Sequence, residues 1–373
     1  MPMNATLFKN GRVYLDGRFQ QGDLLVQDGK IQSFGTLAVS DAQQVDLDGK
    51  LLIPGFMDIH THGGDGVDVN GADKAGFCRI GRFFAAHGVT GWLCSILTDT
   101  ETGGARLLGI HLEGPFLSTQ YKGAMPEHLL RTGDPALFYK YQQAAQGAIR
   151  YMTVSPEVEG VVEMIAALRD HVAIAIGHSG ADYETACAAI DAGARACTHT
   201  FNAMGLFHQH RPGIMGAVLE RDVYCEAICD GRHLHPGSVR MLLACKGYDR
   251  VVAITDSIQA AGLPDGHYKL GVNDVVVVDG DAKLADTGVR AGSTLTMDQA
   301  LKNLVRFTGQ PVERILPLLT LQPAKVIGMD HAKGSIAPGK DGDLVVLNDA
   351  LDVMETYIAG VRVYAGKEKQ EEN

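Results

Sequence analysis

The sequence has no apolar run long enough to cross a bilayer, and its first ten residues lack the apolar core of a secretion signal. The seven cysteines include no Cys-x-x-Cys pair, which indicates reduced thiols in a cytoplasmic protein. The net charge of −11 argues against nucleic acid as a partner. No Gly-x-Ser-x-Gly motif is present, which argues against a serine hydrolase. We therefore expect a cytoplasmic protein that binds neither membranes nor nucleic acid.

The overall composition is that of an ordinary globular protein, with 46% hydrophobic and 21% charged residues among 373. The middle of the chain alternates short apolar stretches with helical patterns of period 3.6, as over residues 158–168. Eight stretches are predicted strands: residues 55–62, 90–97, 107–113, 151–155, 172–178, 195–199, 223–229 and 250–256. Eight strands alternating with helices predict a (β/α)8 TIM-like barrel, in which the chemistry lies at the carboxyl ends of the strands.

Both ends of the chain are instead rich in short strands without helices. Asn10-Gly11 and Asp28-Gly29 are typical of hairpin turns between such strands. The predicted strands are residues 7–14, 23–31, 343–347, 353–358 and 361–364. We expect two domains, which are a small β-sandwich of residues 1–52 and 330–373 and a catalytic barrel of residues 53–329.

The barrel pattern breaks at one place. The second predicted strand ends near Leu97 and the third begins near Leu107, so only residues 98–106 connect them. A parallel crossover needs about a dozen residues or more, usually as a helix. Either the barrel lacks its second helix or residues are absent from the sequence as given, and we favour the second interpretation because both flanks look intact.

Side chains that can bind a metal occur at the carboxyl ends of five predicted strands. His60 and His62 end the first strand, and their i, i+2 spacing points both imidazoles the same way. The other strand-end residues are Glu113, His178, His199 and Asp256. Because strand ends meet at one rim of a barrel, we expect these groups to converge. Four histidines and two carboxylates suffice for one metal ion, or for two ions that share a carboxylate.

This set of ligands predicts a type of chemistry. Imidazole and carboxylate suit Zn²⁺, Fe²⁺ or Mn²⁺. A divalent ion lowers the pKa of a bound water toward neutrality and polarises a carbonyl group. Asp256 can accept the proton of that water and then deliver it to a leaving group. The residues therefore predict hydrolysis of an amide or ester without a covalent intermediate.

Several motifs around these residues give the chain a family resemblance. Residues 54–62, Pro-Gly-Phe-Met-Asp-Ile-His-Thr-His, resemble the amidohydrolase superfamily. The motifs that resemble N-acetylglucosamine-6-phosphate deacetylases more specifically are residues 111–116, 122–124, 177–179, 198–204, 230–233 and 291–296. This resemblance runs from about residue 6 to residue 365. It implies a hydrolase of amino-sugar catabolism that converts N-acetylglucosamine 6-phosphate to glucosamine 6-phosphate and acetate.

The resemblance also implies roles for individual residues. Glu113, His178 and His199 would bind the main divalent metal ion, and His60 and His62 a second ion that only some relatives carry. Zn²⁺ is the expected metal, with Fe²⁺ or Mn²⁺ as alternatives. Asp256 would be the catalytic acid and base, and a homodimer is expected, with a phosphate-binding arginine that reaches across the interface. The implied substrate contacts are Ala124, Met125, Asn202, Ala203, His210, Arg211, His233, Ala291 and Gly292.

Two positions depart from the family pattern. Met125 stands where the family commonly has a histidine that polarises the acetyl carbonyl, and methionine cannot donate a hydrogen bond. We hypothesise that a second metal ion on His60 and His62 polarises the carbonyl instead. His210 stands where the family has the arginine two places before Pro-Gly, and Arg211 follows it, so either side chain can be the one that meets the phosphate.

Three alternatives stay open. The sequence does not separate the galactosamine isomer of the substrate, because the two sugars differ at one hydroxyl. Other amidohydrolase reactions, such as N-acyl amino-acid or cyclic-amide hydrolysis, form a second alternative. The third is a non-catalytic sugar-phosphate-binding protein, against which the intact Asp256 and the five metal-ligand candidates argue.

Overall fold

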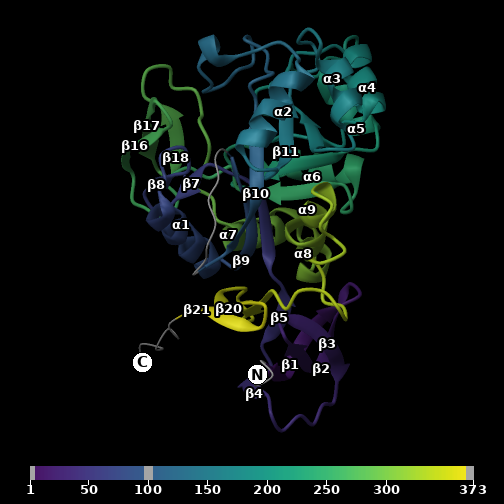
Figure 1. Cartoon of the computed structure of the whole chain (residues 1–373), viewed down its shortest axis with the longest axis vertical. Coiled ribbons are helices and arrows are strands. Elements are labelled where there is room, and N and C mark those ends of the chain that lie inside the picture. Colours follow the sequence, from purple (N-terminus) through teal and green to yellow (C-terminus); the bar gives the residue numbers. More distant parts are fainter. Residues whose placement is uncertain (1–4, 96–103, 367–373) are drawn as a thin grey trace.

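Eight parallel strands form the centre of the computed structural model, which describes residues 5–95 and 104–366 (Figure 1). Their order in the sheet follows the chain from first to last. The strands are β6 (Phe56–Thr61), β9 (Val89–Ser95), β10 (Arg106–Glu113), β11 (Ile149–Val154), β12 (Ala173–Ile176), β13 (Ala196–Cys197), β14 (Tyr224–Ile228) and β15 (Val251–Ile254). Each overlaps one of the eight predicted strands, and the predicted barrel is confirmed.

Hydrogen bonds just beyond the last strand close the barrel. The Asp256 N–H donates to the His60 carbonyl at 2.9 Å, and the His62 N–H donates to the Ser257 carbonyl at 2.7 Å. Below them, the buried Asp58 carboxylate accepts a 2.5 Å hydrogen bond from the Thr255 hydroxyl. The first and last strands are therefore joined at the level where they carry their candidate site residues.

Helices cover the outside of the barrel and bury their apolar faces against it. They are α1 (Lys74–Ala86), α2 (Pro135–Ala144), α3 (Val161–Leu168), α4 (Tyr183–Ala192), α5 (Gly213–Glu220), α6 (Pro236–Lys246), α7 (Met297–Thr308), α8 (Val312–Leu319) and α9 (Leu321–Val326), with a 3-10 turn at Glu127–Leu129. In α1, the Asp73 side chain caps the helix by accepting from the Gly76 N–H. In α6, Pro236 begins the helix and Gly247, with φ of 71°, ends it. Within the described residues, no helix combines the length and apolarity that a membrane span requires.

The short connection after the second barrel strand falls mostly outside the described residues. β9 and β10 are parallel neighbours, with Arg106 opposite Gly91 and His111 opposite Ser95. Residues 96–103, which join them, lie outside the described residues. The interpretation that residues are absent there therefore stays a prediction.

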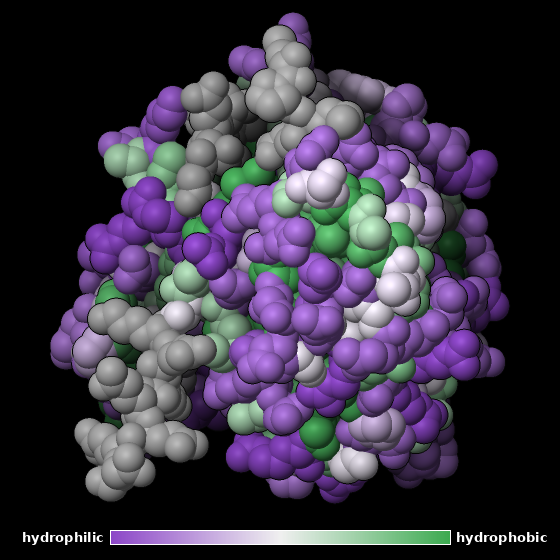
Figure 2. Space-filling model, turned by 90° about the horizontal axis from the view of Figure 1, so that it is seen from below, coloured by the Kyte–Doolittle hydropathy of each residue, from purple (hydrophilic) through white to green (hydrophobic). Residues whose placement is uncertain are grey.

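The two ends of the chain build a second sheet at the foot of the barrel (Figure 1). Its strands are β1 (Ala5–Leu15), β2 (Arg18–Gln27), β3 (Lys30–Gly35), β4 (Gln43–Asp46), β5 (Leu51–Pro54), β19 (Leu344–Leu347), β20 (Val353–Ile358) and β21 (Val361–Ala365). The antiparallel pair β5 and β19 joins the two ends of the chain. The terminal sheet has an apolar cluster of its own, which includes Phe8, Leu24 and Tyr357. Seen from this end, the surface is mostly hydrophilic with scattered apolar patches (Figure 2), as expected of a sheet that turns an apolar face inward.

One of the two predicted hairpin turns is wrong. Asp28 and Gly29 do form the two-residue turn between β2 and β3, both with positive φ. Asn10-Gly11 instead forms a bulge inside β1, which continues to Leu15. A Cβ on Gly11 would lie 2.2 Å from the Leu47 side chain, so this glycine serves close packing and not a turn.

A small three-stranded sheet is inserted after the last barrel strand. Its strands are β16 (Gly266–Leu270), β17 (Asn273–Val278) and β18 (Asp281–Leu284), and a two-stranded ribbon of β7 (Gly63–Gly64) and β8 (Val67–Asp68) follows β6. Val275, Val277 and Ala282 pack against Ile258 and Ala291. The Asn273 side chain also donates to the Ala124 carbonyl at 2.9 Å, so this sheet lies beside the segments that carry candidate substrate contacts.

Candidate metal centre and active site

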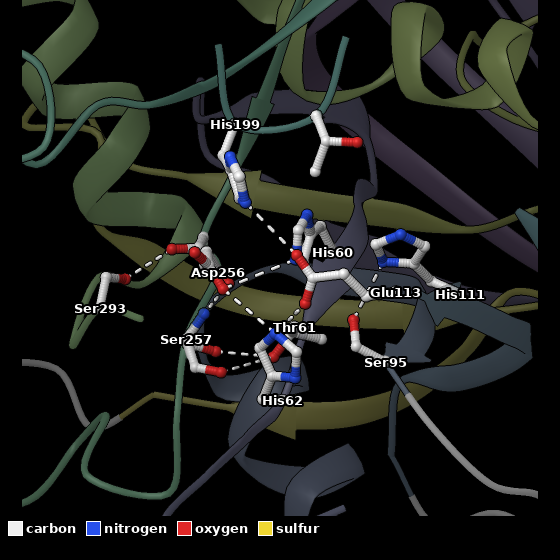
Figure 3. Close-up of polar contacts among 12 residues, drawn as sticks. His60, Thr61, His62, Ser95, His111, Glu113, His199, Asp256, Ser257 and Ser293 are labelled. Carbon is white, nitrogen blue, oxygen red and sulfur yellow. Dashed lines mark hydrogen bonds and ion pairs between the residues drawn. The ribbon is translucent and has the colours of Figure 1, made fainter. Parts of the chain in front are cut away.

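The five predicted metal ligands converge at the carboxyl rim of the barrel, and all are buried. They form two groups whose possible ligand atoms lie within 4.8 Å of one another. One group is His60, His62 and Glu113, and the other is Glu113, His178 and His199. The convergence predicted from strand ends is therefore found, with Glu113 as the shared member (Figure 3).

Glu113 is the centre of the cluster. Its Oε1 lies 3.1 Å from His178 Nε2, 3.3 Å from His199 Nε2 and 3.4 Å from His60 Nε2. Its Oε2 lies 3.2 Å from His62 Nε2. One carboxylate thus reaches four imidazoles from three strand ends, and it would be the ligand common to both groups if two cations were bound.

The imidazole nitrogens are arranged in a way that suits a divalent cation. Nε2 of His178 and Nε2 of His199 lie 2.9 Å apart, while the Nδ1 of His178 faces the Tyr121 carbonyl at 2.8 Å. Since that carbonyl can only accept, His178 carries a proton on Nδ1, and its Nε2, which lies 3.1 Å from Glu113 Oε1, is the atom left to bind a metal ion. Nε2 of His60 is also buried without a hydrogen-bond partner within the described part of the chain. Two converging groups of lone pairs and carboxylates of this type fit metal ions.

The electrostatics support the same conclusion. Burial alone would lower the pKa of His60, but the carboxylates of Glu113, Asp256 and Glu226 outweigh it and raise that pKa well above its usual value. Burial would likewise raise the pKa of Asp256, but His60 and His62 lower it to about 2. Three buried carboxylates thus require positive charge at this rim, which a divalent cation supplies.

Asp256 occupies the position expected of an acid and base. Its Oδ1 lies 3.3 Å from His62 Nε2 and 3.6 Å from His60 Nε2. The residue adopts φ of 50°, and its carbonyl accepts from the Ser293 N–H at 2.7 Å. Figure 3 shows its carboxylate facing the histidines from the side opposite Glu113. A Cβ on the neighbouring Gly292 would lie 3.0 Å from the Asp256 carbonyl and 2.4 Å from Ile258, so this position needs glycine.

Most predicted substrate contacts flank the cluster. The turn that carries Ala124 and Met125 lies against the His178 ring, because a Cβ on Gly123 would be 3.2 Å from it. The Asn202 amide donates to the His199 carbonyl, and the Ala203 carbonyl accepts from Ser179 N–H.

Further along the rim, the predicted contacts are also built into the fold. Nδ1 of the buried His233 side chain lies 2.7 Å from Asp230 Oδ2. Ala291 is buried, and its N–H donates to the Ala282 carbonyl. Ala291 and Gly292 therefore connect the inserted sheet to the Asp256 loop.

His210 and Arg211 are placed differently. Both are exposed, on a loop that begins with the equally exposed Leu206 and Phe207. Within the described residues, no hydrogen bond or ion pair joins either side chain to the buried cluster. The structure brings the ligand candidates together, but it does not bring this pair to them.

Two buried networks beneath the cluster were not predicted. Ser95, His111, Thr153 and Thr198 form a hydrogen-bonded chain across the barrel, with contacts of 2.7 to 3.1 Å. Glu226 is fully buried on β14 and contacts both His60 and His199. The available signal was a charged residue inside an otherwise apolar strand, which demands compensation when it is buried.

Comparison with known proteins adds independent information. A model of the amidohydrolase family matches residues 51–363. The chain is 34% identical over 374 residues to N-acetylglucosamine-6-phosphate deacetylase of Bacillus subtilis (strain 168), covering 94% of each. It is also 34% identical over 364 residues to N-acetylgalactosamine-6-phosphate deacetylase of Escherichia coli O157:H7, covering 92% of this chain and 95% of the relative.

The fold is shared with solved structures of such enzymes. One is a mutant N-acetyl-D-glucosamine-6-phosphate deacetylase of Mycobacterium smegmatis in complex with N-acetyl-D-glucosamine-6-phosphate. It superposes with a TM-score of 0.88 at 32% identity, covering 98% of this chain and 100% of that one. The similarity therefore spans the barrel and the terminal sheet together.

Proposed function

The chain belongs to the amidohydrolase family, and on this premise we propose that it removes the acetyl group from N-acetylglucosamine 6-phosphate to give glucosamine 6-phosphate and acetate. The observation that carries the proposal is the buried Glu113-centred cluster with Asp256 at its edge. Relatives named for this reaction match the chain over nearly its whole length at 34% identity. Cleavage of a linear amide by a metal-dependent hydrolase uses these residue types.

The family depends on divalent metal ions, and the residues in place fit them. We propose that Glu113, His178 and His199 hold one ion and that His60 and His62 hold a second. Zn²⁺ is the preferred candidate, with Fe²⁺ or Mn²⁺ as alternatives, because imidazole and carboxylate suit all three. When bound, such an ion supplies a water of lowered pKa and polarises the acetyl carbonyl.

Asp256 then moves the proton. Its low pKa keeps it a carboxylate, which accepts a proton as water adds to the acetyl carbon. The same group returns that proton to the sugar nitrogen as the carbon–nitrogen bond breaks, so that the free amine leaves. Backbone hydrogen bonds to His60 and Ser293 hold Asp256 on both sides, which keeps the carboxylate at the reacting atoms.

The remaining residues are proposed to bind the sugar phosphate. Ala124, Asn202, Ala203, His233, Ala291 and Gly292 surround the cluster, and Met125 stands where a carbonyl-polarising donor is expected. His210 or Arg211 would meet the phosphate through a charge-assisted hydrogen bond. Their exposed loop, with Leu206 and Phe207 beside them, fits the proposal of a homodimer in which a second subunit covers it.

Two further proposals complete the assignment. We infer that residues 53–329 form the catalytic domain and residues 1–52 with 330–373 the smaller one, since the chain passes from β5 to β6 at Gly55. We also propose a cytoplasmic location, which fits reduced cysteines and a phosphorylated metabolite as substrate.

A second candidate substrate is N-acetylgalactosamine 6-phosphate, because a relative named for it is equally similar to this chain. The experiment measures acetate release from both hexosamine phosphates, before and after chelation and again after Zn²⁺ is restored. We expect faster turnover of the glucosamine isomer and loss of activity of at least about a thousandfold on chelation. Faster turnover of the galactosamine isomer would reassign the substrate, and binding of both sugars without acetate release would make the protein a non-catalytic binder.

A further inference from the structure

Glu226 carries a buried charge in the middle of a barrel strand. It lies on β14, its side chain is fully buried, and its strand neighbours Cys225 and Ala227 are apolar and buried as well. A carboxylate in such a place costs several kcal/mol unless it is compensated. Its compensation is not a basic side chain but the candidate metal centre.

One oxygen of Glu226 makes both of its contacts with the centre. Oε2 lies 3.0 Å from His60 Nδ1 and also accepts the His199 backbone N–H at 3.0 Å. The other oxygen, Oε1, makes no hydrogen bond of regular geometry among the described residues, but Glu226 lies near the Tyr151 hydroxyl, whose pKa is raised by burial and by this carboxylate. The carboxylate is therefore oriented by His60 and His199, one from each of the two ligand groups.

The contact with His60 decides which ring nitrogen carries the proton. Because a carboxylate only accepts, His60 donates from Nδ1, and Nε2 is the ring atom left to bind a metal ion. That Nε2 lies 3.4 Å from a Glu113 oxygen and 3.6 Å from an Asp256 oxygen. Two carboxylates that face this nitrogen favour positive charge there, which a bound metal ion would supply in place of a proton.

The other imidazoles of the cluster lack this support. Nδ1 of His178 faces a neutral backbone carbonyl, and Nδ1 of His199 is buried without a partner in the described part of the chain. Hydrogen bonding of a ligand histidine to a carboxylate fixes the ring and increases its basicity. Among the four imidazoles, only His60 has such a bond at Nδ1 in the described structure.

We propose that Glu226 is a positioning residue that makes His60 a strong ligand and thereby sets the affinity of the metal ion held with His62. The inference rests on the proposed metal-dependent hydrolase and assigns this residue a role within it. Glu226 acts through His60 and does not touch the substrate. The affinity of the ion held by His178 and His199 should depend far less on Glu226, since Glu226 contacts the backbone N–H of His199 and not its ring.

The test counts metal ions rather than turnover. In Glu226→Gln, the amide oxygen can still accept both hydrogen bonds while the charge is lost. Chelated protein is titrated with Zn²⁺ against a chromophoric competitor, and stoichiometry and affinity are fitted. We expect two ions in the natural protein, and in the variant an affinity for one of them that is about 10- to 100-fold weaker, with the other unchanged.

Glu157→Gln is the matched control. The Glu157 carboxylate accepts from Ser179 Oγ and the Gly180 N–H, two residues that follow His178 in sequence, and within the described residues it makes no hydrogen bond or ion pair with a ligand ring. The Glu157→Gln variant should bind both ions with the affinities of the natural protein. If Glu226→Gln does not fold, Glu226→Asp keeps the charge but retracts it from His60, and it should weaken the same ion.

A second background tests the route through His60. In His60→Asn, adding Glu226→Gln should not change the remaining ion, because the partner of the carboxylate is already gone. Equal weakening of both ions by Glu226→Gln, no weakening, or a single ion in the natural protein would each overturn the inference. Acetate release is measured separately, so selective metal loss in a protein that cleaves neither sugar would sustain this inference and reject the proposed function.

Discussion

The rim of the barrel that carries the candidate metal ligands and the loop of residues 206–211 are built in opposite ways. At the rim, His60 is completely buried and even Asp256 is only 8% exposed, and each is held by hydrogen bonds to neighbouring strands. In the loop, Leu206 is 89% exposed and Phe207 59% exposed. The Arg211 side chain makes no hydrogen bond or ion pair within the described residues.

This difference separates chemistry from recognition. The rim is fixed by strand pairing and by buried partners, so one chain supplies the groups that we propose for hydrolysis. The loop is held by a backbone turn from His208 to Arg211 and not by buried side chains, so we propose that its charged side chains gain a defined position against the substrate or a second subunit. Changes at the rim should therefore reduce turnover, whereas changes in the loop should weaken binding.

Asp256→Asn should have the largest effect, because it removes the proposed acid and base from the rim. Asparagine keeps the size of the side chain but cannot accept the proton, so turnover should fall by about 10²- to 10⁴-fold. The Michaelis constant should change little, because the sugar contacts remain. Acetate release under saturating substrate measures both quantities. A turnover within threefold of the natural protein would remove Asp256 from the role of acid and base.

The rim was largely predictable because barrel geometry is regular. Once eight strands were recognised, any residue at a carboxyl end was known to face the same rim, which placed His60, Glu113 and Asp256 together. Glu226 could not be placed in this way. It lies within a strand, and its proposed role depends on His60 of β6, which is two strands away only across the closure of the barrel, so no local pattern reveals it.

The terminal sheet was predicted in outline but not in detail. Asn10-Gly11 has the residue types of a turn, yet tertiary packing against Leu47 made it a bulge, and the turn lies at Asp16 and Gly17 instead. Turn propensity is a local preference that a close interior contact overrides. Neither could the orientation of His210 and Arg211 be predicted, because an exposed loop has no packing constraint.

Arg211→Ala and His210→Ala test the other side of the comparison. Removal of the side chain that meets the phosphate should raise the Michaelis constant by about 10- to 100-fold, as expected for loss of a charge-assisted hydrogen bond. Turnover should stay nearly constant, and the other variant should behave like the natural protein. The control substrate is unphosphorylated N-acetylglucosamine, whose weak cleavage neither variant should alter. A fall in turnover without a change in binding would contradict the separation of chemistry from recognition.

Met125→His tests whether a hydrogen-bond donor at position 125 can polarise the acetyl carbonyl. Met125 follows the turn that packs against His178, so a histidine there is positioned to donate to the acetyl carbonyl. With only one ion bound, we expect turnover to increase about tenfold or more, since loss of one such hydrogen-bond donor often lowers kcat by about 10²- to 10³-fold. With two ions bound, the second already polarises the carbonyl and no increase is expected. Kinetics at defined metal content distinguish these cases, and an unchanged rate in both would refute the hypothesis.

Asp281→Asn should have the smallest effect, because it alters only how firmly the inserted sheet holds the Ala291–Gly292 segment. Asp281 accepts two hydrogen bonds from the Arg290 guanidinium, at 2.7 and 2.9 Å, and these hold the Asp281 pKa well below its usual value. The unfolded chain binds the proton more readily, so the pair stabilises the fold above about pH 4 and loses its contribution as the pH falls below that value. For this partly exposed pair we expect a loss of at most about 1 kcal/mol in the free energy of unfolding at pH 7.

Urea unfolding from pH 7 down to pH 3.5 measures the difference between Asp281→Asn and the natural protein. The control is Asp274→Asn on the same sheet, whose carboxylate lies 2.9 Å from Lys269 Nζ in a much more exposed pair. It should show a smaller difference at pH 7. A difference for Asp281→Asn that grows as the pH falls would mean that the sheet is held to the rim by something other than this ion pair. The connection between the buried chemistry and its more exposed surroundings would then lie in the apolar contacts of Val275 and Val277 with Ile258 and Ala291.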